Sequence, residues 1–160
     1  MDVTLTELVE LPDGRIEERR PEPRLPSDRV TVLDIQGSTF YAGARTVAGL
    51  LPVPEGAVRP VVVLRLRGRT KVGATFISVI HRYAERLAAV SGRLYLSGVD
   101  EGVRTTLIRS GKLDLGGAVV VESMTPIIGE STLQALADAN AWLLEARGSA
   151  DSPPAGDAGV

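Results

Sequence analysis

The sequence predicts an α/β fold: a mixed, mainly parallel sheet with helices packed on one face. Residues 61–64 (VVVL) form a short apolar run, typical of a strand that is covered on both of its faces. Apolar residues then recur at helical spacing through residues 76–87. Strand and helix patterns alternate along most of the chain, which favours parallel strands joined by helices. Right-handed crossovers would gather the helices on one face if the strand order runs steadily outward.

The N-terminal part predicts a hairpin followed by an extended linker. Residues 3–10 are a strand candidate, Pro12-Asp13-Gly14 is a turn signal, and residues 15–20 can return as an edge strand. Prolines at positions 21, 23 and 26 then keep the chain extended. We therefore expect a hairpin and a proline-rich linker over residues 1–29.

The middle of the chain predicts two strand–helix units. Residues 30–37 alternate as a strand, and a short helix is expected over residues 42–51. Phe40 and Tyr41, which lie between them among small residues, are interpreted as hydrophobic plugs. The second unit is the strand at 61–64 and a helix over about residues 74–90, with Gly92 just past its end.

The C-terminal part predicts two more strands and two more helices. Residues 93–97 form a strand with a turn at Gly98, Asp100 caps a helix that ends at Gly111, and residues 118–121 form a short strand. Ser131 and Gln134 have capping-box spacing and would start a helix over residues 131–146. Its expected inward residues are Leu133, Leu136, Ala137, Leu143 and Leu144. One domain is thus expected over residues 1–147, with a disordered tail over residues 148–160.

Composition narrows the functional classes. The 160 residues carry a net charge of −2, which does not favour a nucleic-acid binder, and cysteine is absent, which removes thiol chemistry and disulfides. No apolar run approaches the length of a membrane span, and no signal peptide is visible. We expect a cytosolic protein, or the cytosolic piece of a larger one.

The sequence contains no recognisable arrangement of the residues that usually carry out catalysis. His81 is the single histidine and lies within a predicted helix, so it forms no metal cluster. Phosphate-binding loops, dinucleotide fingerprints and serine-nucleophile motifs are absent. The sequence therefore does not favour an enzyme, and it indicates no metal and no cofactor.

One arrangement of residues remains as a candidate site, a basic loop between the strand at 61–64 and the helix that starts near residue 74. Free N–H groups at a helix N-terminus favour an anion, and hydroxyl groups lie nearby. The candidate residues for binding an anion, a phosphate or an acidic partner are Arg65, Arg67, Arg69, Thr70, Lys71 and Thr75. The alternative is a solvated loop whose arginines pair with nearby carboxylates.

Taken together, these segments resemble the STAS domain, which is shared by sulfate permease-type (SulP) anion transporters and, more distantly, bacterial anti-sigma factor antagonists. Three segments carry the resemblance, which covers roughly residues 3–144: residues 61–99, VRTTLIRSG at 103–111, and VTVLDIQGSTFYAGA at 30–44 followed by Leu51-Pro52. The last of these is similar to the permease branch in particular. The resemblance implies a STAS-like fold.

At the position of the family's phosphorylation site the sequence departs from the antagonist pattern. Antagonists carry an Asp-Ser pair at the start of the central helix, where Gly73 and Ala74 stand here. Ala74 has no hydroxyl, so phosphorylation cannot occur at that position. Thr70 and Thr75 are the neighbouring hydroxyls that could replace it.

The resemblance implies a regulatory or interaction domain at the cytoplasmic face of the inner membrane, as the C-terminal part of a SulP-type sulfate or anion transporter. Its partner would be the transmembrane domain of the same transporter or a cytosolic regulatory protein. Two alternatives stay open: a free-standing, antagonist-like regulator, and a module that binds a nucleotide or an inorganic anion. Neither nucleic acid nor a membrane span of its own is expected.

Overall fold

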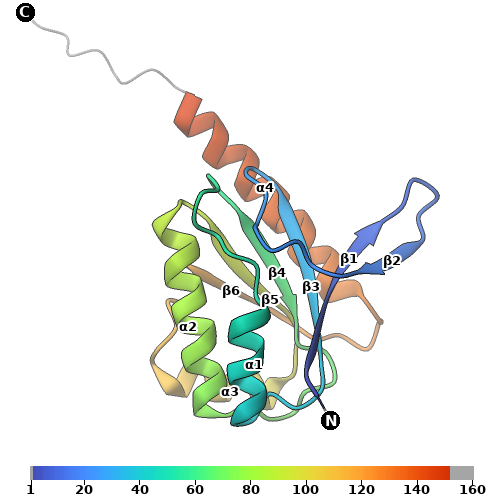
Figure 1. The fold of residues 1–160 in the computed structure, drawn as a ribbon, viewed down its shortest axis with the longest axis vertical. Helices are drawn as coiled ribbons and strands as arrows, with labels where there is room; N and C mark the ends of the chain where they lie inside the picture. The colour runs from blue at the N-terminus through green and yellow to red at the C-terminus, as the bar shows by residue number, and fades with distance from the viewer. Residues whose placement is uncertain (1, 152–160) are drawn as a thin grey trace, which may run out of the picture.

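The computed structural model describes residues 2–151, which form a six-stranded sheet with helices on both faces (Figure 1). The sheet order is β2-β1-β3-β4-β5-β6, and β3 to β6 run parallel while β1 is antiparallel to both of its neighbours. This confirms the predicted α/β class with a mixed, mainly parallel sheet. The elements are β1 Thr4–Glu10, β2 Ile16–Arg19, β3 Val30–Gln36, α1 Ala42–Leu50, β4 Val61–Arg65, α2 Ala74–Ala89, β5 Arg93–Val99, α3 Glu101–Ser110, β6 Val119–Ser123 and α4 Glu130–Asp151.

The N-terminal hairpin forms as predicted. Leu11 donates its backbone N–H to the carbonyl of Arg15, and Gly14 closes the turn at a φ of +85° that suits glycine. β2 is an edge strand whose residues are all exposed, so its charged sequence meets solvent. The extended segment that follows pairs briefly with the chain after α1, through a bridge between Arg24 and Val53.

The main core lies between the sheet and α1, α2 and α3. On β4, Val62 and Leu64 point into this core, together with Leu33 of β3 and Leu96 of β5. α2 contributes a fully buried stripe that includes Phe76, as its helical periodicity predicts. These three helices each join two parallel strands, so the right-handed crossover rule gathers them on one face.

α4 corrects the expectation that all helices share one face. It follows the last strand rather than joining two strands, so the crossover rule does not constrain it. Val61, Val63 and Tyr95 alternate with the main-core residues and point to the opposite face, where they would be exposed without a cover. α4 buries them against Ala135, Ala139 and Leu143, and the apolar run of β4 is thus covered on both faces.

The predicted helix at this position is confirmed and its start differs by one residue, but the predicted cap and most of the expected inward residues are wrong. The helix begins at Glu130, and the Ser131 hydroxyl accepts a hydrogen bond from the Gly98 N–H at 2.9 Å, so it forms no capping box with Gln134. Leu143 faces inward as expected, whereas Leu133 and Leu144 are 67% and 71% exposed. Ala137 is exposed as well, and Leu136 is half-buried. Small residues at positions 131, 135 and 139 form the contact face instead.

Two boundaries differ from the prediction. Residues 148–151 belong to α4 rather than to a disordered tail, and the rest of the expected tail, residues 152–160, lies outside the described residues.

Gly98 is not a turn: it lies within β5 at φ +63°, beside a register shift between β5 and β6. A Cβ at Gly98 would lie 2.9 Å from the Cβ of Arg67, so this close approach requires glycine. Within residues 2–151 no helix is long and apolar enough to cross a membrane.

Candidate functional site

The basic loop lies at the carboxyl ends of the parallel strands, between β4 and α2, as predicted. β4 ends at Arg65, and the Leu66 N–H still donates to the carbonyl of Ser97 on β5 at 2.8 Å. The chain then turns at Gly68 and reaches α2 at Ala74. Ligand sites of open α/β sheets usually form at this end of the strands, so the position of the loop suits a functional surface.

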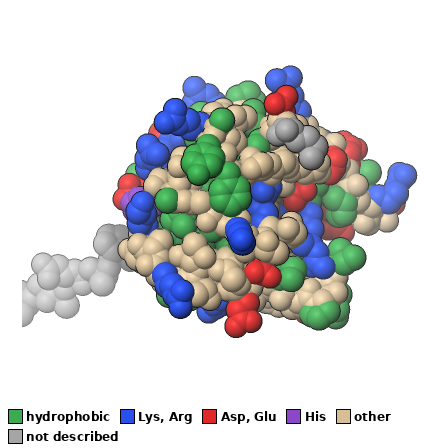
Figure 2. All heavy atoms as spheres, turned by 90° about the horizontal axis from the view of Figure 1, so that it is seen from below, with side chains coloured by type: hydrophobic (Ala, Val, Ile, Leu, Met, Phe, Trp, Pro, Cys, Tyr) green, Lys and Arg blue, Asp and Glu red, His purple; other side chains and the backbone are tan. Residues whose placement is uncertain are grey.

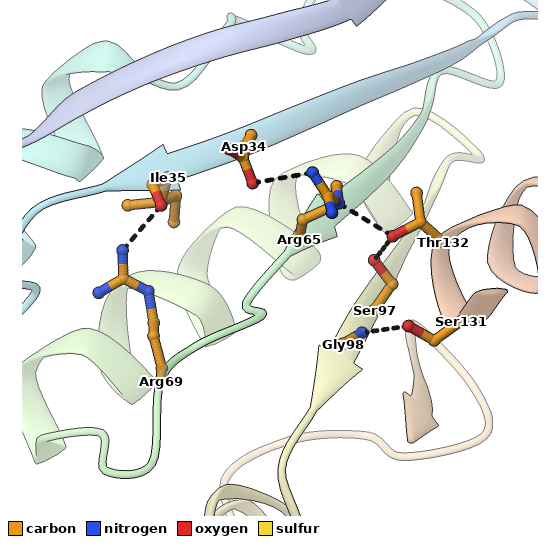
Figure 3. A network of polar contacts seen from close by, with 8 residues as sticks. All are labelled: Asp34, Ile35, Arg65, Arg69, Ser97, Gly98, Ser131 and Thr132. Carbon is orange, nitrogen blue, oxygen red and sulfur yellow. Dashed lines mark hydrogen bonds and ion pairs between the residues drawn. The ribbon is translucent and has the colours of Figure 1, made fainter. Parts of the chain in front are cut away.

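Arg65 points toward α4 and is held there by polar contacts (Figure 3). Its Nε donates to the Thr132 hydroxyl at 3.0 Å, and its guanidinium lies 3.5 Å from the Asp34 carboxylate on β3. Thr132 in turn shares a hydrogen bond of 2.9 Å with the Ser97 hydroxyl. Arg65 therefore connects three elements, and its charge is offset within the protein.

Arg69 points to the other side of the loop, toward the end of β3. Its Nη1 donates to the carbonyl of Gly37 at 2.8 Å, and its Nη2 donates to the carbonyl of Ile35 at 2.9 Å. Burial lowers the pKa of the Arg69 guanidinium because the charged form loses solvation. The guanidinium thus serves to hold the loop against β3.

Arg67 takes a third direction. Its Nη1 donates to the carbonyl of Thr125, after β6, at 3.4 Å. The structure therefore does not bring the three guanidiniums together at one point. Within the described chain, Arg65 is the one of these three arginines that pairs with a carboxylate, that of Asp34. Arg67 and Arg69 donate to backbone carbonyls instead. Anion binding by this loop stays a prediction.

Thr70 and Lys71 are the candidate residues that remain at the surface. Both are exposed, while Thr75 is half-buried in the first turn of α2, and its side chain faces the groove between α1 and α2. Val72 is buried between them and anchors the loop to the main core. A partner that reaches this end of the molecule would meet Thr70 and Lys71 before any of the three arginines.

The structure shows what surrounds Gly73 and Ala74, the residues at the position of the antagonist phosphorylation pair. Gly73 is the N-cap of α2 and supplies no side-chain cap to the helix. A Cβ at Gly73 would lie 3.2 Å from Cδ1 of Phe40, so the Phe40 ring occupies the space that an aspartate side chain would need. Ala74 is exposed and offers only a methyl group.

The aromatic pair before α1, Phe40 and Tyr41, is not among the candidate site residues that the sequence predicts, although the structure exposes it. Tyr41 is 83% exposed and Phe40 is 43% exposed, so the plug prediction is wrong for Tyr41 and holds only for the side of Phe40 that contacts Gly73. Tyr41 also has a φ of +50°, in the left-handed region that non-glycine residues rarely adopt. In the sequence, the signal for such a site is an aromatic residue directly before a predicted helix. Figure 2 looks onto this end of the molecule, where hydrophobic side chains gather beside Lys and Arg side chains.

Comparisons with known proteins give no relative for this chain. Neither a protein-family model, nor a curated protein, nor a solved structure matches it. In the part of the chain that the structure describes, no group of three or more His, Cys, Asp or Glu residues could hold a metal ion.

Proposed function

We propose that this chain is a STAS-like regulatory and interaction domain that docks on the membrane part of a SulP-type anion transporter. Its binding surface is the end of the molecule formed by Phe40, Tyr41, Thr70 and Lys71, called the aromatic–basic surface below. The domain does not transport the anion itself. It acts at the cytoplasmic face of the membrane, and its partner is the transmembrane domain of the same transporter.

The observation that carries this proposal is the exposure of Tyr41 at a strained backbone position. Holding a non-glycine residue at positive φ costs free energy, of order 1–3 kcal/mol, and such strain gathers at functional sites. Here the strained residue presents a large aromatic ring to solvent, at 83% exposure. Exposed tyrosines are enriched at protein interfaces because the ring buries apolar area while its hydroxyl stays hydrogen-bonded.

Electrostatics supports a protein partner over a phosphate ligand at this surface. Arg65, Arg67 and Arg69 each bond to other parts of the chain and do not converge on a common point. Lys71 is exposed two residues before Gly73, which lies against the Phe40 ring, and it suits the polar rim of an interface. A phosphate would need several convergent donors, whereas an apolar patch with a basic rim suits an acidic protein surface.

The first test is the reading frame upstream of Met1. The proposal expects it to encode a multi-helix membrane segment, and a native start at Met1 with no such segment would overturn the transporter assignment. The binding test uses that membrane segment in detergent, with this chain added as a separate protein. Tyr41→Ser should weaken the measured affinity at least about tenfold, since a buried aromatic anchor usually contributes 2 kcal/mol or more.

Ile108→Ser is the matched control, because Ile108 is an exposed apolar residue on α3, at 53% exposure. It should leave the affinity unchanged. If both substitutions weaken binding equally, the aromatic–basic surface is not the docking site. Circular dichroism of both variants checks that the fold is retained.

A further inference from the structure

A second surface lies on the opposite layer of the molecule, between α4 and the N-terminal hairpin. α4 packs on β4, β5, β6 and the adjoining part of β3. β1 and β2 extend the sheet beyond the helix, and their α4-side face carries a groove of about 770 Å³. We call it the hairpin groove. Its apolar lining comes from Leu8, Ile16, Val32, Leu133 and Leu136.

Several large apolar side chains are exposed in and beside the hairpin groove. Ile16 is 61% exposed and Leu133 is 67% exposed, on opposite sides of the groove. Ile127 and Ile128, directly before the lining residue Gly129, are 62% and 80% exposed. Exposed apolar patches of this kind, rimmed by polar residues, mark interaction sites because covering them removes apolar area from water.

The polar lining of the groove is predominantly negative. Glu10 and Glu18 line the groove, and neither carboxylate forms an ion pair with another described residue. Arg65 also lines it, but its charge is offset by Asp34 at 3.5 Å. The nearby arginines of the hairpin, Arg15 and Arg19, are each engaged by an acidic neighbour, Asp13 and Glu17.

We propose that the hairpin groove binds an amphipathic helix of a partner protein, with one apolar face flanked by Lys or Arg. The apolar face would lie along Leu8, Val32 and Leu136, and the basic flanks would meet Glu10 and Glu18. A helix places apolar residues at three- and four-residue spacing along one stripe, which suits a groove that has apolar residues on both of its walls, α4 and the hairpin. This surface lies on the other side of the sheet from α1–α3 and does not depend on the aromatic–basic surface.

Two other occupants fit the charges and the sequence less well. A second copy of this chain would bring its own Glu10 and Glu18 toward the same acidic groove, and like charges at an interface are unfavourable. The C-terminal residues 152–160 (SPPAGDAGV) contain no Lys or Arg and no large apolar side chain except Val160, so they lack the required chemistry.

The test uses three synthetic peptides of about 16 residues, long enough to form an isolated helix. The first places Leu on one helical face and Lys on the other. The second replaces every Lys by Glu, and the third keeps the Leu and Lys composition in scrambled order. Fluorescence anisotropy with the full chain should give at least about tenfold tighter binding for the first peptide than for the other two.

Variants then locate the binding. Leu133→Ser should weaken the Lys peptide about fivefold or more, while Leu144→Ser, the matched control at 71% exposure on the same helix, should leave it unchanged. The pair Glu10→Gln and Glu18→Gln should weaken binding and reduce its salt dependence. Tyr41→Ser should have no effect, which separates this proposal from the docking function above.

Three results would overturn the proposal. One is equal binding of the Lys and Glu peptides, and another is an equal loss in the two leucine variants. The third is a dimer in sedimentation experiments at micromolar concentration that Leu133→Ser dissociates, because a second copy would then occupy the groove.

Discussion

Arg69 joins the loop before α2 to the end of β3 through one guanidinium. Two of its nitrogens donate to the carbonyls of Ile35 and Gly37, at 2.9 and 2.8 Å. Hydrogen bonds from a charged donor are stronger than neutral ones, and the planar guanidinium can reach two carbonyls at once. Arg69 is therefore part of the fold, although its charge alone suggests a ligand-binding role.

We predict that Arg69→Met destabilises the protein by about 2 kcal/mol, because two carbonyls lose a charge-assisted donor. Arg67→Met is the matched control, since Arg67 makes one contact of 3.4 Å, and it should change the unfolding free energy by less than about 0.5 kcal/mol. Urea denaturation monitored by circular dichroism measures both values. Equal stability of the two variants would contradict the structural role of Arg69.

The three loop arginines also show what sequence could and could not predict at the candidate site. Their position after a buried strand and before a helix follows from the apolar pattern, and the structure has the loop there. Their directions differ because the strand ends at Arg65 and each side chain then meets a different partner. Those partners include backbone carbonyls, which every residue carries, so side-chain chemistry gives no signal for them.

α4 is attached to the sheet by polar contacts at its first turn and by small residues along its length. The Ser131 hydroxyl accepts the Gly98 N–H at 2.9 Å, and both groups are buried. Gly98 lies where β5 departs from regular pairing with β6, so its N–H depends on a side chain for a partner. The register shift cannot be read from the sequence, in which the spacing of Ser131 and Gln134 predicts a cap instead.

We predict that Ser131→Ala lowers the unfolding free energy by about 1–3 kcal/mol, because the Gly98 N–H would stay buried without an acceptor. Ser123→Ala serves as control: the Ser123 hydroxyl accepts from Arg104 at an exposed site, so its loss should cost less than about 0.5 kcal/mol. Thermal and urea unfolding of both variants give the comparison. A neutral Ser131→Ala would mean that α4 does not depend on this bond.

The orientation of α4 gives a second prediction from two adjacent leucines. Leu143 is 5% exposed and packs against the sheet, while Leu144 is 71% exposed. Leu143→Ala should cost about 2–3 kcal/mol through lost burial and a residual cavity, whereas Leu144→Ala should stay within about 0.5 kcal/mol. If the two costs are equal or reversed, the helix is oriented differently from the structure described.

At the scale of the whole molecule, the order of the elements could be predicted and the position of α4 could not. Alternating strand and helix patterns, turn residues and proline positions specify local structure, and the crossover rule then fixes α1, α2 and α3. The contact face of α4 is formed by Ala135 and Ala139, which are weak hydrophobic signals beside Leu133 and Leu144. The packing of these small residues against Tyr95 therefore sets the orientation of α4, and the larger Leu133 and Leu144 face solvent.

The two layers also meet at a pair of carboxylates that couples stability to pH. Glu122 on β6 and Asp138 on α4 are both half-buried, and Gln134 donates to Asp138 at 2.9 Å. Burial, together with a hydrogen bond to Asp138 and its negative charge, raises the pKa of the Glu122 carboxyl from 4.5 to about 7. The folded protein thus retains a proton at Glu122 that the unfolded chain releases near its ordinary pKa.

Because the folded state binds this proton more tightly, its stabilising effect is fully present below pH 4.5 and is lost as the pH rises through about 7. After allowance for partial solvent exposure, the unfolding free energy should fall by about 1–2 kcal/mol between about pH 5 and pH 8.5. Glu122→Gln should remove this part of the pH dependence and make the protein more stable than the wild type at the upper end of the range. Asp138→Asn should also reduce this pH dependence, because it removes the negative charge that helps to raise the pKa of Glu122. Urea unfolding of the three proteins across the range measures how the unfolding free energy changes with pH. A Glu122→Gln slope equal to that of the wild type would contradict the role of Glu122 in this pH dependence.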